Sequence, residues 1–239
     1  MAKELKASSR MEATAAHLRE NIFKGKLAPG TPLRELSLAR ELSVSQATVR
    51  AALQYLEHSG LVTRTPNLGS TVTRLSSKDI RERVALRATL EVMAAKQAST
   101  RMGEPEFMEL MRLLRALERG VQSDSYYETA QSDLDFHRYI WKCSGNDTLA
   151  QILELITVPL LAFISIVRSQ GLQRLLSVVQ AHEPLIDALR SGNLEEIQAK
   201  FELAVTSGYQ PFLIDGPESA AARAFGFLSM EWPVIRVPE

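Results

Sequence analysis

Asp133 and His137 form the clearest pair of chemically active side chains in the sequence. They stand four residues apart in the segment DLDFH, so on a helix they lie on one face about one turn apart. A carboxylate oxygen and an imidazole nitrogen in that arrangement suit a divalent metal ion such as Zn²⁺. An ordinary contact in a polar core would use the same spacing, so the pair marks a candidate site without fixing its occupant.

A second group of polar side chains lies within residues 33–69, where a short helix, a tight turn, a longer helix and two strand-like runs follow one another. The longer helix has one apolar side at the spacing of a buried stripe, made of Val49, Ala52, Leu53 and Leu56. Gln46, Arg50 and Gln54 fall on another side, where they are free to touch a partner. This order of elements predicts a winged helix-turn-helix, which places its second helix in the DNA major groove.

Further signals mark the ends of the longer helix and the tip of the wing. Ser45 is placed to cap the helix start, and Gly60 to end the helix in a left-handed turn. Arg50 projects from the first turns of the helix, where it can reach a guanine edge or a phosphate. The Ser45 hydroxyl and the amides of the helix start can bind a phosphate. Asn67 and Gly69 shape a wing tip small enough to approach the minor groove.

The remainder of the chain is predicted to be helical. Short breaks between amphipathic helices indicate an antiparallel bundle, with helices expected at 80–99, 105–120, 124–143, 147–170, 172–191 and 194–213. The predicted fold is therefore mainly α, with an N-terminal winged helix-turn-helix and a C-terminal all-α antiparallel helical bundle. The expected organisation is a disordered arm at 1–10, a DNA-binding domain at 11–75, an effector-binding and dimerisation domain at 79–215 and a tail of unknown role at 216–239.

The distribution of charge agrees with this division. The chain has 28 Lys and Arg against 28 Asp and Glu. Residues 1–78 alone carry 12 basic and 6 acidic side chains, a net of +6, which leaves −6 for residues 79–239. A basic N-terminal part on an acidic C-terminal part is expected if only the first meets phosphates.

Cysteine content and hydropathy point to a cytoplasmic protein without a membrane partner. The single cysteine, Cys143, excludes an intrachain disulfide and any multi-cysteine zinc site. The start of the chain is polar and charged, unlike a signal peptide. The longest apolar stretch, 160–167, is interrupted by Ser165 and is far shorter than a membrane span.

Four motifs within residues 29–73 carry a family resemblance. They are Gly30…Leu33-x-Glu35-x-x-Leu38-Ala39, Val44-Ser45-x-x-x-Val49-Arg50-x-Ala52-Leu53, Leu56-x-x-x-Gly60-Leu61-Val62 and Asn67-x-Gly69. Together they resemble the GntR superfamily of bacterial transcription regulators. The helical remainder looks like the FadR-type branch, whose C-terminal (FCD) domain is an all-helical ligand-sensing bundle. The resemblance covers roughly residues 11–213.

For the DNA-binding half, the resemblance implies contacts from Arg34, Ser45, Gln46, Thr48, Arg50, Asn67 and Gly69. The chain also departs from the family pattern. Gln46 and Leu68 stand where arginines are common, Ala51 where glutamate is usual, and Arg34 where a serine usually caps the preceding helix. Because Gln46 and Leu68 replace two arginines, we expect fewer phosphate contacts and a weaker salt dependence of DNA binding. Gln46 can read adenine bidentately instead.

For the helical half, the resemblance adds partners to the Asp133 and His137 pair. The FadR-type branch often binds a divalent metal through such a pair and two further histidines from the last two helices. His182 matches the first of these, whereas the second would fall at Ala204, which cannot coordinate a metal. Three roles are open for Asp133, His137 and His182. They could hold Zn²⁺ or a similar ion whose shell is completed by water or effector, they could bind an organic effector directly, or they could form a polar core without a ligand.

Arg87 completes the set of candidate effector-binding residues. It matches an arginine that often lies near the ligand cavity in the FadR-type branch, and its planar fork suits a carboxylate. A salt bridge with Glu91 or Asp133 is the alternative role for this side chain. The resemblance therefore implies a small organic acid as the effector.

The function predicted from these features is that of a ligand-responsive bacterial transcription regulator. It would bind a pseudo-palindromic double-stranded operator as a homodimer, with repression relieved by ligand as the commoner arrangement in the family. One alternative is a DNA-binding dimer without an effector. Another is a metal-dependent enzyme, but no acid/base constellation surrounds the candidate metal ligands, and His17 and His58 lie in the DNA-binding half. We therefore expect no enzyme.

Overall fold

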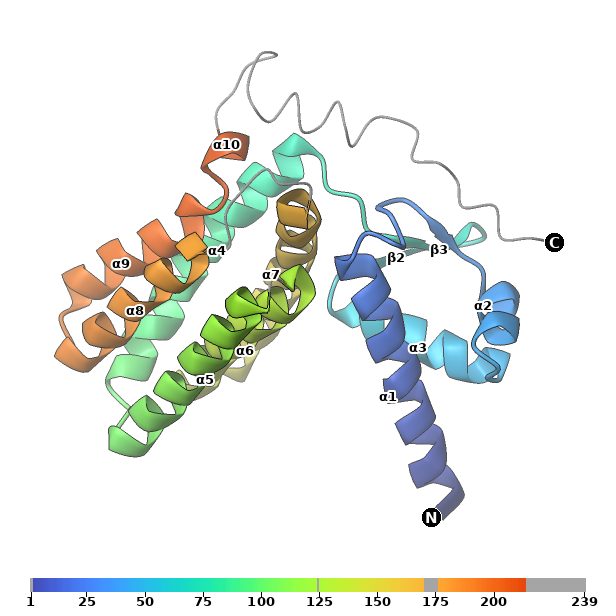
Figure 1. Ribbon diagram of the computed structural model, residues 1–239, viewed down its shortest axis with the longest axis horizontal. Coiled ribbons are helices and arrows are strands. Elements are labelled where there is room, and N and C mark those ends of the chain that lie inside the picture. The colour runs from blue at the N-terminus through green and yellow to red at the C-terminus, as the bar shows by residue number, and fades with distance from the viewer. Residues whose placement is uncertain (1, 124, 170–175, 214–239) are drawn as a thin grey trace.

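The computed structural model describes residues 2–123, 125–169 and 176–213, in two parts that Figure 1 shows side by side. The N-terminal part holds three helices and a small sheet: α1 (Ala2–Phe23), β1 (Pro32–Leu33), α2 (Glu35–Glu41), α3 (Gln46–His58), β2 (Val62–Thr65) and β3 (Gly69–Val72). Helix α1 packs against α3, and the three strands form an antiparallel sheet in the order β1-β3-β2. The predicted winged helix-turn-helix is confirmed.

Both ends of α3 follow from local sequence. The Ser45 hydroxyl accepts a hydrogen bond from the Thr48 amide at 3.1 Å, which caps the helix start. Gly60 has a φ of +73°, and the amides of Gly60 and Leu61 donate to the carbonyls of Glu57 and Leu56 at 2.9 and 3.1 Å. This pair of bonds is a Schellman motif, which satisfies carbonyls that the helix itself leaves unpaired.

Two features of the N-terminal part differ from the sequence-based expectation. The arm expected at residues 1–10 is helical, because α1 begins at Ala2; alanine, lysine, glutamate and leucine in this segment favour a helix. The sheet has a third strand, β1, in which Pro32 pairs with Thr71 and Leu33 with Ser70. Two residues are too few to produce a recognisable strand pattern.

The C-terminal part is a bundle of antiparallel helices, as predicted. Its elements are α4 (Ser77–Ser99), α5 (Glu104–Gln122), α6 (Tyr126–Cys143), α7 (Asp147–Ser169), α8 (Leu176–Ser191), α9 (Leu194–Ser207) and α10 (Gln210–Leu213). Helix α4 packs against α6, α7 and α9, so it runs through the middle of the bundle. Ser76 and Asp79 form a capping box at its start. The expected helix at 194–213 is divided near Gly208, and the tail at 216–239 lies outside the described residues.

Helix α7 corrects the expectation about apolar length. Its 23 residues include an 18-residue window with a mean hydropathy of 2.1, which by length and composition alone could cross a membrane. However, 72% of that window is buried inside the fold, which is how the core helix of a bundle behaves. Ser165 is a buried polar residue within this helix, and its hydroxyl donates to the carbonyls of Phe23 and Tyr126 at 3.2 and 3.3 Å. These contacts join α7 to the end of α1 and to the start of α6.

Candidate ligand-sensing site and DNA-binding face

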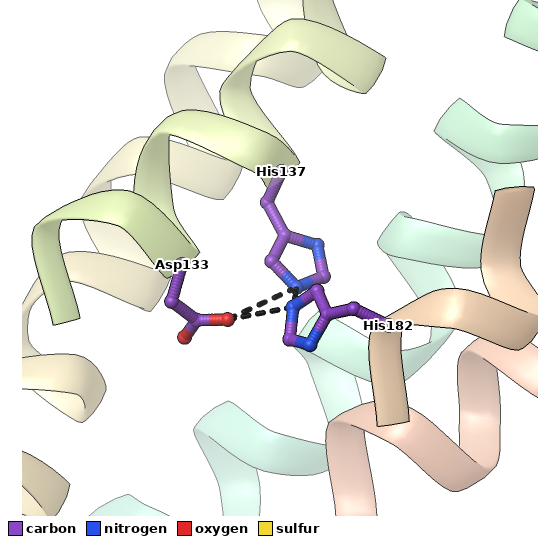
Figure 2. A group of neighbouring side chains, drawn as sticks. All are labelled: Asp133, His137 and His182. Atoms are coloured by element: carbon purple, nitrogen blue, oxygen red, sulfur yellow. Dashed lines mark hydrogen bonds and ion pairs between the residues drawn. The ribbon is translucent and has the colours of Figure 1, made fainter. Parts of the chain in front are cut away.

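Three buried side chains bring their ligand atoms to one point in the bundle (Figure 2). Asp133 and His137 lie one turn apart on α6, and His182 reaches them from α8. Asp133 Oδ1 is 2.7 Å from His182 Nε2 and 3.8 Å from His137 Nε2, and the two Nε2 atoms are 3.2 Å apart. The structure thus brings together the three residues that the sequence proposed as metal ligands.

The outer nitrogen of each histidine already has a partner. His182 Nδ1 lies 2.7 Å from the carbonyl of Val178, which can only accept, so Nδ1 carries the proton. His137 Nδ1 lies 3.1 and 3.2 Å from the two carboxylate oxygens of Glu91. Each Nε2 therefore faces the site, where it can donate to Asp133 when it carries a proton and offer a lone pair to a cation when it does not. This is the usual arrangement of metal-binding histidines, in which an outer acceptor fixes the tautomer.

Glu91 is the buried acceptor that organises this region. Besides His137, it accepts hydrogen bonds from Arg87 Nε at 3.2 Å and Trp141 Nε1 at 2.8 Å. Burial tends to raise the pKa of Glu91, but His137, Arg87 and Trp141 outweigh it and lower the pKa to about 2. The carboxylate is therefore ionised at neutral pH. Sequence reasoning named Glu91 only as an alternative partner of Arg87; its contacts with α6 depend on the fold.

Asp133 is also held in its charged form. Burial tends to raise its pKa, whereas His182, His137 and Arg87 hold it well below the ordinary range of an aspartate. One carboxylate oxygen and two imidazole nitrogens make a donor set that Zn²⁺ and similar divalent ions accept. Two unprotonated nitrogens this close repel each other unless a proton or a cation lies near both. The residues present therefore fit a divalent metal, with three protein ligands.

A cavity of about 220 Å³ opens beside these ligands. Arg87, Arg168 and Tyr209 add polar groups to its wall, and Ala204 lines it where a third histidine was expected. Among the described residues, neither Arg168 Nε nor Tyr209 Oη has a hydrogen-bond partner, although both are buried. Burial raises the pKa of Tyr209 to about 12 despite the nearby arginines, so its hydroxyl stays a neutral donor. Two arginines and a phenol facing one cavity can bind a carboxylate.

The cavity also shows what the sequence reasoning missed. Arg168 comes from the end of α7, and Tyr209 stands between α9 and α10. Neither residue belongs to a local motif, and each is more than 30 residues from Asp133 along the chain. Arg87 pairs with Glu91 and also lines the cavity, so its contact with an effector stays a prediction.

On the DNA-binding face, Arg50 and Gln46 share a partner, Glu35, that the sequence did not predict. Arg50 donates from Nε at 3.1 Å to both oxygens of Glu35 and from Nη2 at 2.8 Å to one of them. Gln46 Nε2 donates to the same carboxylate at 2.9 Å. Arg64, on β2 of the wing, lies 3.9 Å from it. The hydrogen bond from Arg50 is the main cause of the lowered pKa of Glu35.

The other predicted DNA contacts lie at the surface around this cluster. The Ser45 oxygen accepts in the cap of α3 and lies 2.8 Å from Thr48 Oγ1, and its contact with phosphate stays a prediction. Arg34 is exposed and begins α2 without a side-chain cap. Asn67 and Gly69, with φ of 64° and 90°, form the exposed wing tip.

Comparison with known proteins agrees with both parts of the fold. A family profile described as "Bacterial regulatory proteins, gntR family" matches residues 10–72, and an "FCD domain" profile matches residues 82–202. The chain is 27% identical over 179 residues to "Uncharacterized HTH-type transcriptional regulator YdhC" of Bacillus subtilis, covering 74% of this chain and 80% of that protein. It is 26% identical to a "Probable D-xylose utilization operon transcriptional repressor" of Paenarthrobacter nicotinovorans, with coverage of 73% and 76%. The solved structure of E. coli McbR/YncC has the same fold, with a TM-score of 0.73 and 20% identity over 85% of this chain and 96% of that one.

Proposed function

Because the chain belongs to the GntR family of bacterial transcription regulators and carries an FCD domain, we propose that it is a repressor that leaves its operator when a small carboxylate enters the bundle. Its relatives include proteins named as transcriptional repressors. The regulator acts in the bacterial cytoplasm, as a homodimer whose two α3 helices enter successive major grooves of double-stranded DNA. Residues 11–75 form the DNA-binding domain and residues 79–215 the sensor. This function accounts for the cavity without assigning it an enzymatic reaction.

The sensor holds a divalent metal ion through Asp133, His137 and His182. The observation that carries this assignment is the direction of the two Nε2 atoms, which face the Asp133 carboxylate while the acceptors at Glu91 and Val178 engage the Nδ1 atoms. When bound, the ion supplies Lewis-acid coordination for an oxygen of the effector. The place of the absent third histidine, beside Ala204, is then open to water or to that effector.

The effector is a small acid because of the charges around the cavity. Arg87 and Arg168 offer two guanidinium groups, and Tyr209 offers a hydroxyl donor. A volume of about 220 Å³ suits a metabolite-sized molecule. Hydroxy acids and dicarboxylates match this chemistry, since one oxygen pair can chelate a metal while a carboxylate pairs with an arginine.

The metal can be tested with a matched pair of histidine variants. After incubation with Zn²⁺ and dialysis, wild-type protein should retain about one ion per chain by elemental analysis. His137→Ala should lose the ion, whereas His17→Ala, at an exposed position on α1, should retain it. Wild-type protein that retains no ion would overturn the metal assignment.

The effector is tested on the same samples with a panel of hydroxy acids and dicarboxylates. A correct acid should raise the melting temperature and weaken binding to a duplex that the protein selects from random DNA. Typical couplings of this kind change affinity by about 5- to 150-fold. If no acid changes either quantity, the effector proposal fails. If the protein selects no duplex, the repressor proposal fails.

A further inference from the structure

Glu35 lies where the two helices of the DNA-binding motif meet the wing. It is the first residue of α2, and its side chain is 21% exposed. Its carboxylate accepts hydrogen bonds from Arg50 and Gln46, both on α3, and lies near Arg64 on β2. All three of these side chains come from elements that a winged helix presents to DNA. A negative charge at this surface opposes phosphate binding, so its presence needs another explanation.

The hydrogen bonds determine which edges of the two α3 side chains remain available. Arg50 uses Nε and Nη2 for Glu35, which leaves the edge formed by Nη1 and Nη2 facing away from the carboxylate. That edge carries the two parallel N–H groups that a bidentate contact with guanine requires. Gln46 uses one amide hydrogen for Glu35, so its other amide hydrogen and its oxygen remain for adenine. Glu35 thus fixes one edge of each side chain and leaves the base-reading edge free.

We propose that Glu35 is a positioning residue for sequence recognition: it holds Arg50 and Gln46 in the orientations that read bases, without touching DNA itself. The proposal rests on the proposed function, in which α3 reads the operator. Holding long side chains in advance reduces the freedom they lose on binding. It also prevents Arg50 from turning to the nearest phosphate, which any DNA sequence offers.

Glu35→Gln tests this proposal because it removes the charge and preserves the shape. We expect binding to a scrambled duplex to strengthen, with a salt slope steeper by up to about 0.9, since Arg50 becomes available to one more phosphate. Preference for the selected duplex over the scrambled one should fall by about 10-fold, within the range expected for one bidentate base contact. Selection from random DNA with the variant should lose information at the positions read by α3.

Glu41→Gln is the matched control, because it removes the same charge from the exposed C-terminal end of α2. This control should change non-specific binding only slightly and leave the preference intact. Equal preference in Glu35→Gln and wild-type protein would overturn the proposal. So would a proportional fall in both affinities with a lowered melting temperature, which would make Glu35 a purely structural residue. Failure of the underlying function looks different, because wild-type protein would then show no preference at all.

Discussion

Replacement of Glu91 by glutamine should damage both the stability of the bundle and its affinity for metal. The Glu91 side chain is fully buried and accepts hydrogen bonds from Arg87, His137 and Trp141. Arg87 is itself only 4% exposed, so the substitution leaves a buried cation without its nearest counter-charge. Removing one partner of a buried ion pair costs about 3–5 kcal/mol. For a chain of this size, that corresponds to a fall in melting temperature of about 10 °C.

The assay for this prediction separates stability from metal binding. Unfolding in urea is followed with EDTA present, so that the difference in free energy of unfolding reports on the metal-free fold alone. Titration with Zn²⁺ in a chelator-buffered solution then gives the metal affinity, which should fall about 10- to 100-fold because His137 loses the acceptor that orients it. Trp141 lies beside His137 and donates to Glu91, so its fluorescence should respond to both changes.

Glu154→Gln is the control for this prediction, since Glu154 forms a partly exposed pair with Arg138 between α6 and α7. Pairs that water can reach are worth less than buried ones, and the hydrogen bonds of Arg138 go to Glu154 and Asp135 and not to the histidines. If Glu91→Gln destabilises the metal-free protein no more than Glu154→Gln does, the account of Glu91 as an organising charge is wrong. An unchanged Zn²⁺ affinity would show that metal binding by His137 does not depend on the Glu91 carboxylate.

Three further outcomes are expected. Ala204→His should supply the missing ligand and tighten Zn²⁺ binding at least 10-fold in chelator competition, and weaker binding would show that position 204 does not face the metal. Hydrogen bonds from Ser76 lower the pKa of Asp79, so the stabilisation from its carboxylate is present at neutral pH and is lost as the pH falls through that lowered value. Asp79→Asn should therefore flatten the acid side of the plot of unfolding free energy against pH. A plot parallel to that of the wild-type protein would contradict this. Gly60→Ala should lower the melting temperature more than Gly192→Ala does. Both glycines have positive φ, but only a Cβ at position 60 would lie 2.8 Å from the Leu155 carbonyl oxygen. Equal falls in melting temperature would mean that backbone strain alone determines the loss.

The parts of this fold that sequence reasoning predicted are those determined by neighbours along the chain. The stripe on α3, the Ser45 cap and the Gly60 turn all act within one helix, so their residue types reveal them. The same holds for the Asp133 and His137 pair, whose spacing places both on one face of α6. The resemblance to a known family added His182, which no local pattern connects to that pair.

The parts that could not be predicted depend on contacts between distant segments. Glu35 and Arg50 are 15 residues apart, and nothing in either helix alone indicates that one binds the other. Glu91 joins α4 to α6 across 46 residues, and Tyr209 reaches the cavity from beyond α9. These contacts arise only after the helices have packed, so residue spacing contains no signal for them. They are also the contacts that determine charge and orientation at both sites.

The proline inside α7 limits how this chain can change in evolution. Pro159 has no N–H, so the Leu155 carbonyl loses its helical donor and instead accepts a hydrogen bond from Arg83 at 3.2 Å, next to Gly60 at the end of α3. Nine residues further along the same helix, Arg168 lines the sensor cavity. Each inserted residue turns a helix by about 100°. A single insertion or deletion between these two points would therefore rotate Arg168 out of the cavity while the contact with the DNA-binding part stayed in place.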